Sequence, residues 1–443
     1  MKAPPYALTR APQGAMRADR QSRIRWALEG TTKPPGRSGR RRLEGSPSLS
    51  FTFRSGIMKV EKLGLRFGLA AGALVAAAGA QAQGVVKVGF IGEMSGPFAE
   101  FGKQMETGIQ IYQKEHGDTV AGKKVVVIVK DVGGPNPELS KRHAQELVVR
   151  DKVDFIAGFA FSPNAFAVAP IATEAKKPMV IMNAASGTLP SASPYIVRTS
   201  FSLPAIVPPI SQWMIKQGYK TTYSMVADYS PGHEVEAAFL DSYKKAGGTV
   251  VGSVRTPLST MDFSAYMQKI KDTKPAAVFA FVNGADVAQA FMREYRARNL
   301  ADGGTAMVGT GDITDEPTID SMGDTPLGAV TGYPYSMDHD SPMNKKFVQA
   351  FKAARGQQAR PNIMAVAGYD GMALIYEALR KTQGKTDGDA LIAAMKGVKL
   401  ESPRGPIEID AATRDVKQRV YMRKVERVDG RMANIEFEAI EPK

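Results

Sequence analysis

The sequence predicts an α/β protein built from two successive doubly wound blocks, in which helices cover both faces of a mainly parallel sheet. Short runs of valine, isoleucine and other apolar residues, uninterrupted by polar ones, indicate strands that are buried on both faces. Amphipathic stretches of helical length separate these runs, which is typical of parallel strands joined by helical crossovers. The pattern restarts near the middle of the chain, which indicates two blocks of similar size.

The first block begins at Val85. Its expected strands are Val85–Ile91, Lys124–Val129, Val153–Phe159 and Met179–Ala184, and its expected helices are Phe101–His116, Pro137–Arg150 and Ser162–Lys177. A joint near Thr199–Pro204 leads into the second block. There the expected strands are Thr222–Asp228, Thr249–Arg255, Ala277–Val282 and Met307–Gly309, and the expected helices are Ala205–Gln217, Glu234–Ala246, Tyr266–Thr273 and Val287–Arg298.

The last part of the chain returns to long helices and then to strands. After Gly332 the pattern predicts the helices Met343–Arg355, Ile363–Thr382 and Asp389–Val398. The tail from Arg419 to Glu438 is rich in strand-forming residues and contains Asp429-Gly430, a dipeptide favoured in tight hairpin turns. We therefore expect the chain to end in a β-hairpin.

Composition sets limits on function. The 443 residues suffice for two or three domains, and the hydrophobic content of 43% is ordinary for a globular protein. The absence of cysteine excludes disulfides, thiolate zinc sites, iron–sulfur clusters and cysteine nucleophiles. Residues 1–82 hold 15 basic and 4 acidic residues, so most of the net charge of +14 lies there. The charge therefore does not indicate a nucleic-acid partner for the remainder.

The N-terminal region joins two different segments. Residues 1–57 are rich in Arg, Pro, Gly and Ser, and we expect a disordered basic segment upstream of the true start. From Met58 a basic stretch precedes the apolar run Phe67–Gly79, which is too short for a spanning helix of about 20 residues. Ala80-Gln81-Ala82 follows as an A-x-A cleavage signal. We expect residues 58–82 to be a signal peptide, cleaved near Ala82, and the protein to be exported to the periplasm.

Loops that follow strands are the expected ligand-binding segments, because facing parallel sheets place the carboxyl ends of their strands at a shared cleft. In the first block, Phe98 and Phe101 follow a Gly-Pro turn, and at least one of them is expected to line the pocket, the alternative being an ordinary turn with one core aromatic. Ser162 is predicted as a helix N-cap that either serves only the helix or helps its free N–H groups to hold a carboxylate. In the loop 183–187, Ser186 and the backbone N–H groups are further candidate donors.

Three strands of the second block also end in polar loops. Tyr229 follows the first and is placed to close over a ligand from the opposite block, and Asn283 follows the second. Asp312 follows the third. This acid either lies nearest to a ligand ammonium group or caps a helix over Thr314–Met322.

Enzyme signatures are incomplete throughout. His233-Glu234 opens like a zinc-protease helix, but Ala237 stands where the second histidine is needed. Gly384-Lys385-Thr386 ends like a phosphate loop without its first glycine, and no G-x-S-x-G occurs. The acids at 312, 315 and 316 lack the calcium-loop spacing. We therefore expect a protein that is not an enzyme and has neither a cofactor nor a metal site.

Several of these segments resemble leucine/isoleucine/valine-type periplasmic binding proteins of ABC transporters. The segments are Val88–Gly102 with its Ser-Gly-Pro turn, Gly158–Ser162, Pro178–Ser186 and Gly368-Tyr369-Asp370, and the resemblance extends over Val85–Lys443. It implies the periplasmic binding protein type I fold, with two Rossmann-like lobes joined by three crossovers and closing on ligand about a hinge. The lobes expected on this basis are residues 83–202 with 334–403, and 203–333 with 404–443.

The resemblance also implies a binding site. It places a ligand carboxylate on Ser162 and on the loop matching Ala184 and Ser186, with the aromatic Phe101 packed on the ligand. The second lobe departs from the family pattern, because Asn283-Gly284 stands where an aromatic is usual and the ammonium-binding acid falls at Gly311, next to Asp312. These departures fit an aromatic or other organic acid as an alternative to a branched-chain or other amino acid.

The resulting hypothesis is a monomeric substrate-binding component of an ABC importer. It would capture a small carboxylate-bearing solute between its lobes and deliver it to a permease and ATPase complex. The alternative is a sensor that binds a similar solute and signals. A sensor would usually carry a fused output domain or a membrane span, and the sequence suggests neither.

Overall fold

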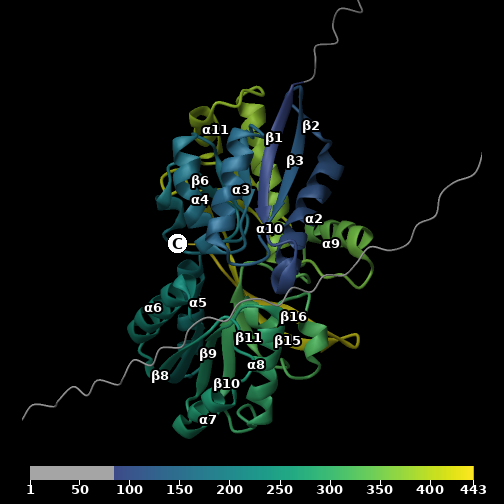
Figure 1. The fold of residues 1–443 in the computed structure, drawn as a ribbon. Helices are drawn as coiled ribbons and strands as arrows, with labels where there is room; N and C mark the ends of the chain where they lie inside the picture. Colours follow the sequence, from purple (N-terminus) through teal and green to yellow (C-terminus); the bar gives the residue numbers. More distant parts are fainter. Residues whose placement is uncertain (1–83, 443) are drawn as a thin grey trace, which may run out of the picture. The chain divides into compact units, whose positions relative to one another are not determined.

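The computed structural model describes residues 84–442. The expected disordered segment 1–57, the signal peptide 58–82 and its cleavage near Ala82 lie outside the described residues and stay predictions. Within the described part, none of the helices is long and apolar enough to cross a membrane. Two separate α/β sheets are formed, as the restarting pattern predicts (Figure 1).

The N-terminal lobe is built on a six-stranded sheet in the order β2-β3-β1-β4-β5-β6. All neighbours are parallel except the short edge pair β2–β3. The strands are β1 (Val85–Gly92), β2 (Thr119–Val120), β3 (Lys123–Asp131), β4 (Phe155–Gly158), β5 (Met179–Ile181) and β6 (Ile196–Arg198). The central strand β4 is buried along its whole length, which explains its continuous run of apolar and small residues.

Helices cover both faces of this sheet. On one face α2 (Ala99–His116) packs against the long helix α10 (Ile363–Lys381), and on the other α3 (Pro137–Val149) packs against α4 (Ser162–Glu174). The α2–α10 contact is close because it meets at glycines: a Cβ on Gly108 would lie 1.9 Å from the carbonyl oxygen of Ala365. The shorter helices α9 (Pro342–Arg355) and α11 (Gly388–Met395) pack against α2 and α10, respectively.

The C-terminal lobe contains a seven-stranded sheet in the order β16-β15-β11-β10-β9-β7-β8. The five strands from β11 to β8 are parallel neighbours: β7 (Thr221–Ala227), β8 (Thr249–Thr256), β9 (Ala277–Phe281), β10 (Ala306–Thr310) and β11 (Val330–Tyr333). Their helices are α5 (Leu203–Lys216), α6 (Ser230–Lys245), α7 (Ser264–Thr273) and α8 (Ala285–Ala297). The apolar faces of α7 and α8 share a core with β9 and β10, and those of α5 and α6 share another.

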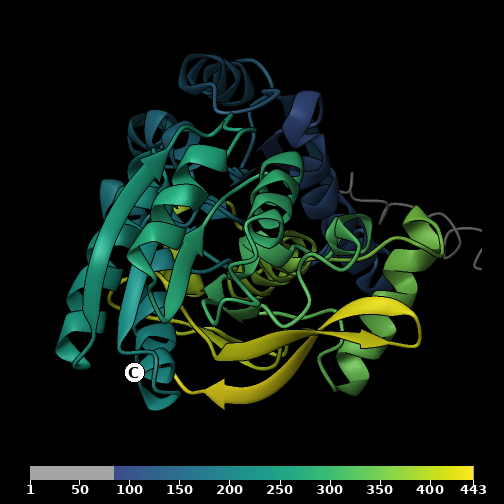
Figure 2. The same cartoon turned by 90° about the horizontal axis from the view of Figure 1, so that it is seen from below.

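The predicted C-terminal hairpin is confirmed. β15 (Val420–Val428) pairs antiparallel with β16 (Arg431–Ile440), and Figure 2 shows the pair in yellow. Asp429 and Gly430 form the turn with φ of 49° and 80°, and the two positive values match the right-handed twist of the strands. The hairpin extends the second sheet by pairing β15 antiparallel with β11.

The segment between α11 and the hairpin adds a small antiparallel sheet of β12 (Lys399–Leu400), β13 (Ile407–Ile409) and β14 (Val416–Lys417). The lobe bounds drawn from the sequence assign residues 404–417 to the C-terminal lobe. The hydrogen bonds of this segment lead to the other lobe: Arg414 donates to the carbonyl of Ile196, and Asp415 accepts from Arg198 Nε at 2.8 Å. We therefore propose that the last crossover lies near residue 418 and that residues 404–417 belong with the N-terminal lobe.

Candidate ligand-binding site

Both lobes share one strand order, which fixes where a ligand can bind. The order β3-β1-β4-β5-β6 of the first sheet corresponds to β8-β7-β9-β10-β11 of the second. In such sheets the connections run to opposite sides of the first strand, and a crevice opens there at the carboxyl ends of the strands. The loops that follow β1 and β4 in one lobe, and β7 and β9 in the other, are therefore the expected walls of the site.

A small cavity lies at these loops. The N-terminal lobe contributes Ala160, Ser162, Asn183 and Ala185 to its wall, and the C-terminal lobe contributes Tyr229, Pro231, Phe281, Asn283 and Asp312. Phe201 and Leu203, at the crossover into α5, complete the lining. A second small cavity shares Asp312 and is lined by Phe101, Asp315, Tyr333 and Met364, among others.

Ser162 lies at the cavity, but its predicted role as an N-cap is wrong. α4 begins at Ser162 itself, Phe161 holds the cap position, and no side chain caps the helix. The Ser162 hydroxyl oxygen accepts a hydrogen bond of 3.1 Å from the backbone N–H of Ser186. Its proton remains free to be donated, and the first N–H groups of a helix have no partner within the helix. This end of α4 can therefore bind an anionic group.

Of the loop after β5, the structure brings Asn183 and Ala185 to the cavity rather than Ala184 and Ser186. The Ala184 N–H donates to the carbonyl of Phe159 at 2.9 Å. The Ser186 hydroxyl donates to Glu234 Oε1 at 2.5 Å, and Glu234 belongs to α6 of the other lobe. The resemblance-based roles of Ala184 and Ser186 as carboxylate donors have no support in these contacts.

The two predicted phenylalanines differ in position. Phe101 lines the second cavity, whereas Phe98 does not line either cavity. The Phe98 ring meets the Phe161 ring edge to face at 4.9 Å and lies 5.6 Å from Phe101. Phe98 therefore packs against the aromatic side chains beside the cavities without lining either of them.

Tyr229, Asn283 and Asp312 all lie at the first cavity, as predicted from their loops. The Tyr229 ring stacks on Phe281, with ring centroids 6.1 Å apart and planes 13° from parallel. Asp312 does not cap a helix over 314–322, because that segment forms two short 3-10 turns, Gly311–Thr314 and Ile319–Met322. Its carboxylate accepts instead from Asn283 Nδ2 at 3.2 Å and from Thr310 Oγ1 at 2.7 Å.

Burial raises the pKa values of two acids in the C-terminal lobe's part of the site. It raises the pKa of Asp312 to about 6 and that of Asp315 to about 7, against the lowering effects of their hydrogen bonds. Asp315 also accepts from Asn362 Nδ2 at 3.0 Å, from the other lobe. The Arg423 guanidinium lies 5.0 Å from the Tyr333 ring centroid, and its positive charge acts to lower the pKa of both acids.

Sequence reasoning missed Glu93, which lies directly after β1. Its side chain is wholly buried, accepts from Asn164 Nδ2 at 3.0 Å and from the Ala160 N–H at 3.3 Å, and so fixes the loop that leads into α4. Burial raises the pKa of Glu93 to about 8. Its place at the end of a predicted strand was the available signal.

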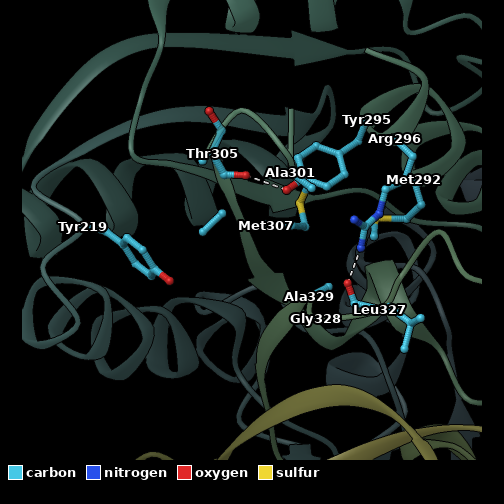
Figure 3. Close-up of a pocket in the computed structure, with 12 residues that line it drawn as sticks. Tyr219, Met292, Tyr295, Arg296, Ala301, Thr305, Met307, Leu327, Gly328 and Ala329 are labelled. Carbon is cyan, nitrogen blue, oxygen red and sulfur yellow. Dashed lines mark hydrogen bonds between the residues drawn. The ribbon is translucent and has the colours of Figure 1, made fainter. Parts of the chain in front are cut away.

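Another cavity, of about 600 Å³, lies away from these loops (Figure 3). It is formed by Tyr295 and Arg296 of α8 and by residues at the amino ends of β10 and β11. Arg296 Nε donates at 2.8 Å to the carbonyl of Thr325. Because ligands of open α/β sheets bind at the carboxyl ends of the strands, this cavity is not the expected site.

Comparison with known proteins agrees with this geometry. The sequence profile of a periplasmic binding protein family matches residues 85–431. The chain is 42% identical over 366 residues to a Leu/Ile/Val-binding protein homolog 6 of Brucella melitensis biotype 1, covering 82% of this chain and 94% of that relative.

Two solved structures are also similar. One is an ABC-transporter solute-binding protein from Rhodopseudomonas palustris BisB5 in complex with 3,4-dihydroxybenzoic acid, with 48% identity, a TM-score of 0.78 and coverage of 81% of this chain and 98% of that one. The other is a solute-binding protein from R. palustris HaA2 in complex with p-hydroxybenzoic acid, with 43% identity, a TM-score of 0.79 and the same coverage.

Two doubly wound lobes, with a cavity between the carboxyl ends of their strands, define a two-lobed solute-binding protein. The matched profile and the relatives specify it further. The chain belongs to the periplasmic binding protein family, of the leucine/isoleucine/valine type, with the type I fold. Its role is that of an ABC-transport substrate-binding protein.

Proposed function

We propose that this protein captures an aromatic carboxylate between its lobes and delivers it to an ABC importer. The observation that carries the proposal is the pairing, in one cavity, of an anion-binding helix start with aromatic side chains. Binding takes place without chemical conversion of the solute.

The carboxylate end of the ligand is assigned to the N-terminal lobe. There Ser162, the first residue of α4, lies at the cavity wall, and its backbone N–H and hydroxyl are the groups that can donate to a carboxylate. The loop that carries them is held by Glu93, which burial keeps mainly neutral at pH 7, so that it does not repel an anion.

The ring of the ligand is assigned to the space between the aromatic side chains. Tyr229 and Phe281 present stacked rings from the C-terminal lobe, and Phe201 lies at the crossover between the lobes. Flat aromatic faces favour an aromatic solute over a branched aliphatic one through stacked or edge-to-face contacts. Similar proteins in complex with dihydroxybenzoic and hydroxybenzoic acids support the same assignment.

Isothermal titration tests this proposal. The purified protein is stripped of bound solute by unfolding and refolding, then titrated with benzoate, 4-hydroxybenzoate, 3,4-dihydroxybenzoate, leucine and valine. We expect at least one aromatic acid to bind about tenfold or more tighter than either amino acid, a difference of about 1.4 kcal/mol. Tighter binding of leucine or valine than of every aromatic acid would contradict the proposal.

We also propose that the protein acts as a monomer in the periplasm, after removal of residues 1–82, and docks on a permease and ATPase complex. The signal-like pattern at 58–82 and the family's role in transport support this location. N-terminal sequencing of the exported protein tests it. A mature chain that begins near Gln83 is expected, and an exported chain that retains residues upstream of Met58 would contradict it.

A further inference from the structure

Two carboxamides face the same cavity from opposite lobes. Asn183 follows β5, Asn283 follows β9, and both line the cavity between the lobes. The Oδ1 atom of each is buried and has no hydrogen-bond partner among the described residues. A buried amide oxygen without a donor is costly, so two of them at one cavity point to donors supplied by the ligand.

The orientation of the two amides follows from their neighbours. Asn283 Nδ2 faces Asp312 Oδ1 at 3.2 Å, and Asn183 Nδ2 faces the carbonyl oxygen of Ala160 at 2.9 Å. A carboxylate and a carbonyl oxygen ordinarily accept rather than donate, so each amide must turn its nitrogen toward that neighbour. The Oδ1 atom of each asparagine is then left without a partner. Flipping either amide would place its oxygen against the acceptor oxygen of its neighbour.

The wall around Asn283 is rich in hydrogen-bond acceptors. Both oxygens of the Asp312 carboxylate already accept protein hydrogen bonds, from Asn283 and from Thr310. The amide oxygen of Asn283, in contrast, has no donor at all among the described residues. A neutral O–H group matches one such oxygen, whereas an ammonium group brings three donors and a full charge into the same space.

We infer that the ligand carries, besides its carboxylate, a ring hydroxyl that donates to Asn283 Oδ1, so that Asn283 selects hydroxylated aromatic acids over their unsubstituted parents. This inference rests on the proposed function and narrows its substrate class. Asn183 offers a second acceptor from the opposite lobe, which suits an acid with two hydroxyl groups. A ligand without a hydroxyl leaves Asn283 Oδ1 buried and unpaired, and sites built to bind a hydroxyl discriminate strongly against such analogues.

The test compares matched ligands on matched variants by isothermal titration. The wild-type protein, Asn283→Ala and the control Gln289→Ala are each titrated with benzoate and 4-hydroxybenzoate. Gln289 is a half-buried carboxamide on α8 whose Nε2 donates to the carbonyl of Ser321, outside the cavity. Thermal melting of each variant checks that it is folded.

The wild-type protein and Gln289→Ala are expected to bind 4-hydroxybenzoate about tenfold or more tighter than benzoate. In Asn283→Ala the dissociation constants of the two acids should differ by less than about threefold, mainly because 4-hydroxybenzoate binds more weakly. Equal wild-type affinities for the two acids would overturn the inference and leave the proposed function standing. An unchanged ratio in Asn283→Ala would also overturn it, whereas a wild-type protein that binds only leucine overturns both.

Discussion

The Ser186 hydroxyl and the Glu234 carboxylate join the two lobes through a hydrogen bond of 2.5 Å. The second oxygen of the same carboxylate accepts from the Gly187 N–H at 2.6 Å. One side chain of α6 thus occupies two donors of the loop after β5, beside the cavity. The contact joins one residue of each lobe, and we expect it to favour an arrangement in which the lobes are together over one in which they are apart.

Replacing Glu234 by Gln should weaken ligand binding by about three- to tenfold, mainly through faster release, because a charge-assisted hydrogen bond of the closed form is lost. Stopped-flow release and titration measure this effect. Glu236→Gln on the same helix is the control, since Glu236 pairs with Ser253 and Arg255 within its own lobe. Equal changes in affinity for both variants would show that the Ser186–Glu234 contact does not act on closure.

Ser162→Ala should lower the affinity for an aromatic carboxylate by about tenfold to a hundredfold. The change removes a donor to an ionised group, worth about 1.5–3 kcal/mol. Titration measures the affinity, and Ser140→Ala is the matched control, because Ser140 is equally buried but bonds only to the carbonyl of Asn136. Full affinity in Ser162→Ala would place the carboxylate elsewhere.

The stability of the protein should fall as the pH rises from about 4.5 toward 8. Glu93 has its pKa raised to about 8 by burial, so the native chain holds a proton there that the unfolded chain releases above its ordinary pKa. The contribution is complete at pH values below the ordinary pKa and is lost as the pH passes the raised value. It is on the order of a few kcal/mol.

Glu93→Gln stays neutral at every pH and should therefore melt with a flatter dependence on pH between 5 and 8. Calorimetry at several pH values compares the two proteins. Asp312 and Asp315, whose pKa values are also raised, should leave part of the slope in place, and Asp131 is the nearby charge that acts on Glu93. Parallel curves for the two proteins would mean that Glu93 is ionised in the native state.

Arg404→Met should destabilise the protein by about 3–5 kcal/mol, because it leaves the Asp370 carboxylate buried without its charge partner. Arg404 Nη2 lies 2.9 Å from Asp370 Oδ2, both side chains are wholly buried, and Arg404 also donates to the carbonyl of Ser200 at the first crossover. Urea unfolding measures the loss. The control is Lys399→Met in the exposed pair with Glu408, where we expect a change of about 1 kcal/mol or less. Similar losses in both variants would contradict this account.

Much of the fold follows from the sequence, since buried strands such as β1 and β9 carry runs of mostly apolar residues that need no tertiary context. The Asp429-Gly430 turn was also predictable, because few dipeptides adopt two positive φ values at low cost. Short elements were not. β6 and β11 contribute three and four residues, too few for a period, and β12–β14 form only through pairing with one another.

The site was predictable where a residue lies within two positions of the end of a strand, as Tyr229, Asn283 and Asp312 do. The prediction was off by one position at Ala184. The point at which the strand ends decides which residue turns toward the cavity, and that residue is Ala185. The predicted role of Ser186 is also unsupported, because its hydroxyl is hydrogen-bonded to Glu234. That residue lies 48 positions further along the chain and belongs to the other lobe. No local pattern reports such a contact.

A crystal structure of the protein with 4-hydroxybenzoate tests the central claim most directly. The account predicts one ligand between the lobes, with its carboxylate at Ser162 and the start of α4, its ring beside Tyr229, and its hydroxyl on Asn283 Oδ1. A ligand with its carboxylate against Asp312, or one bound outside the cleft between the lobes, would contradict it.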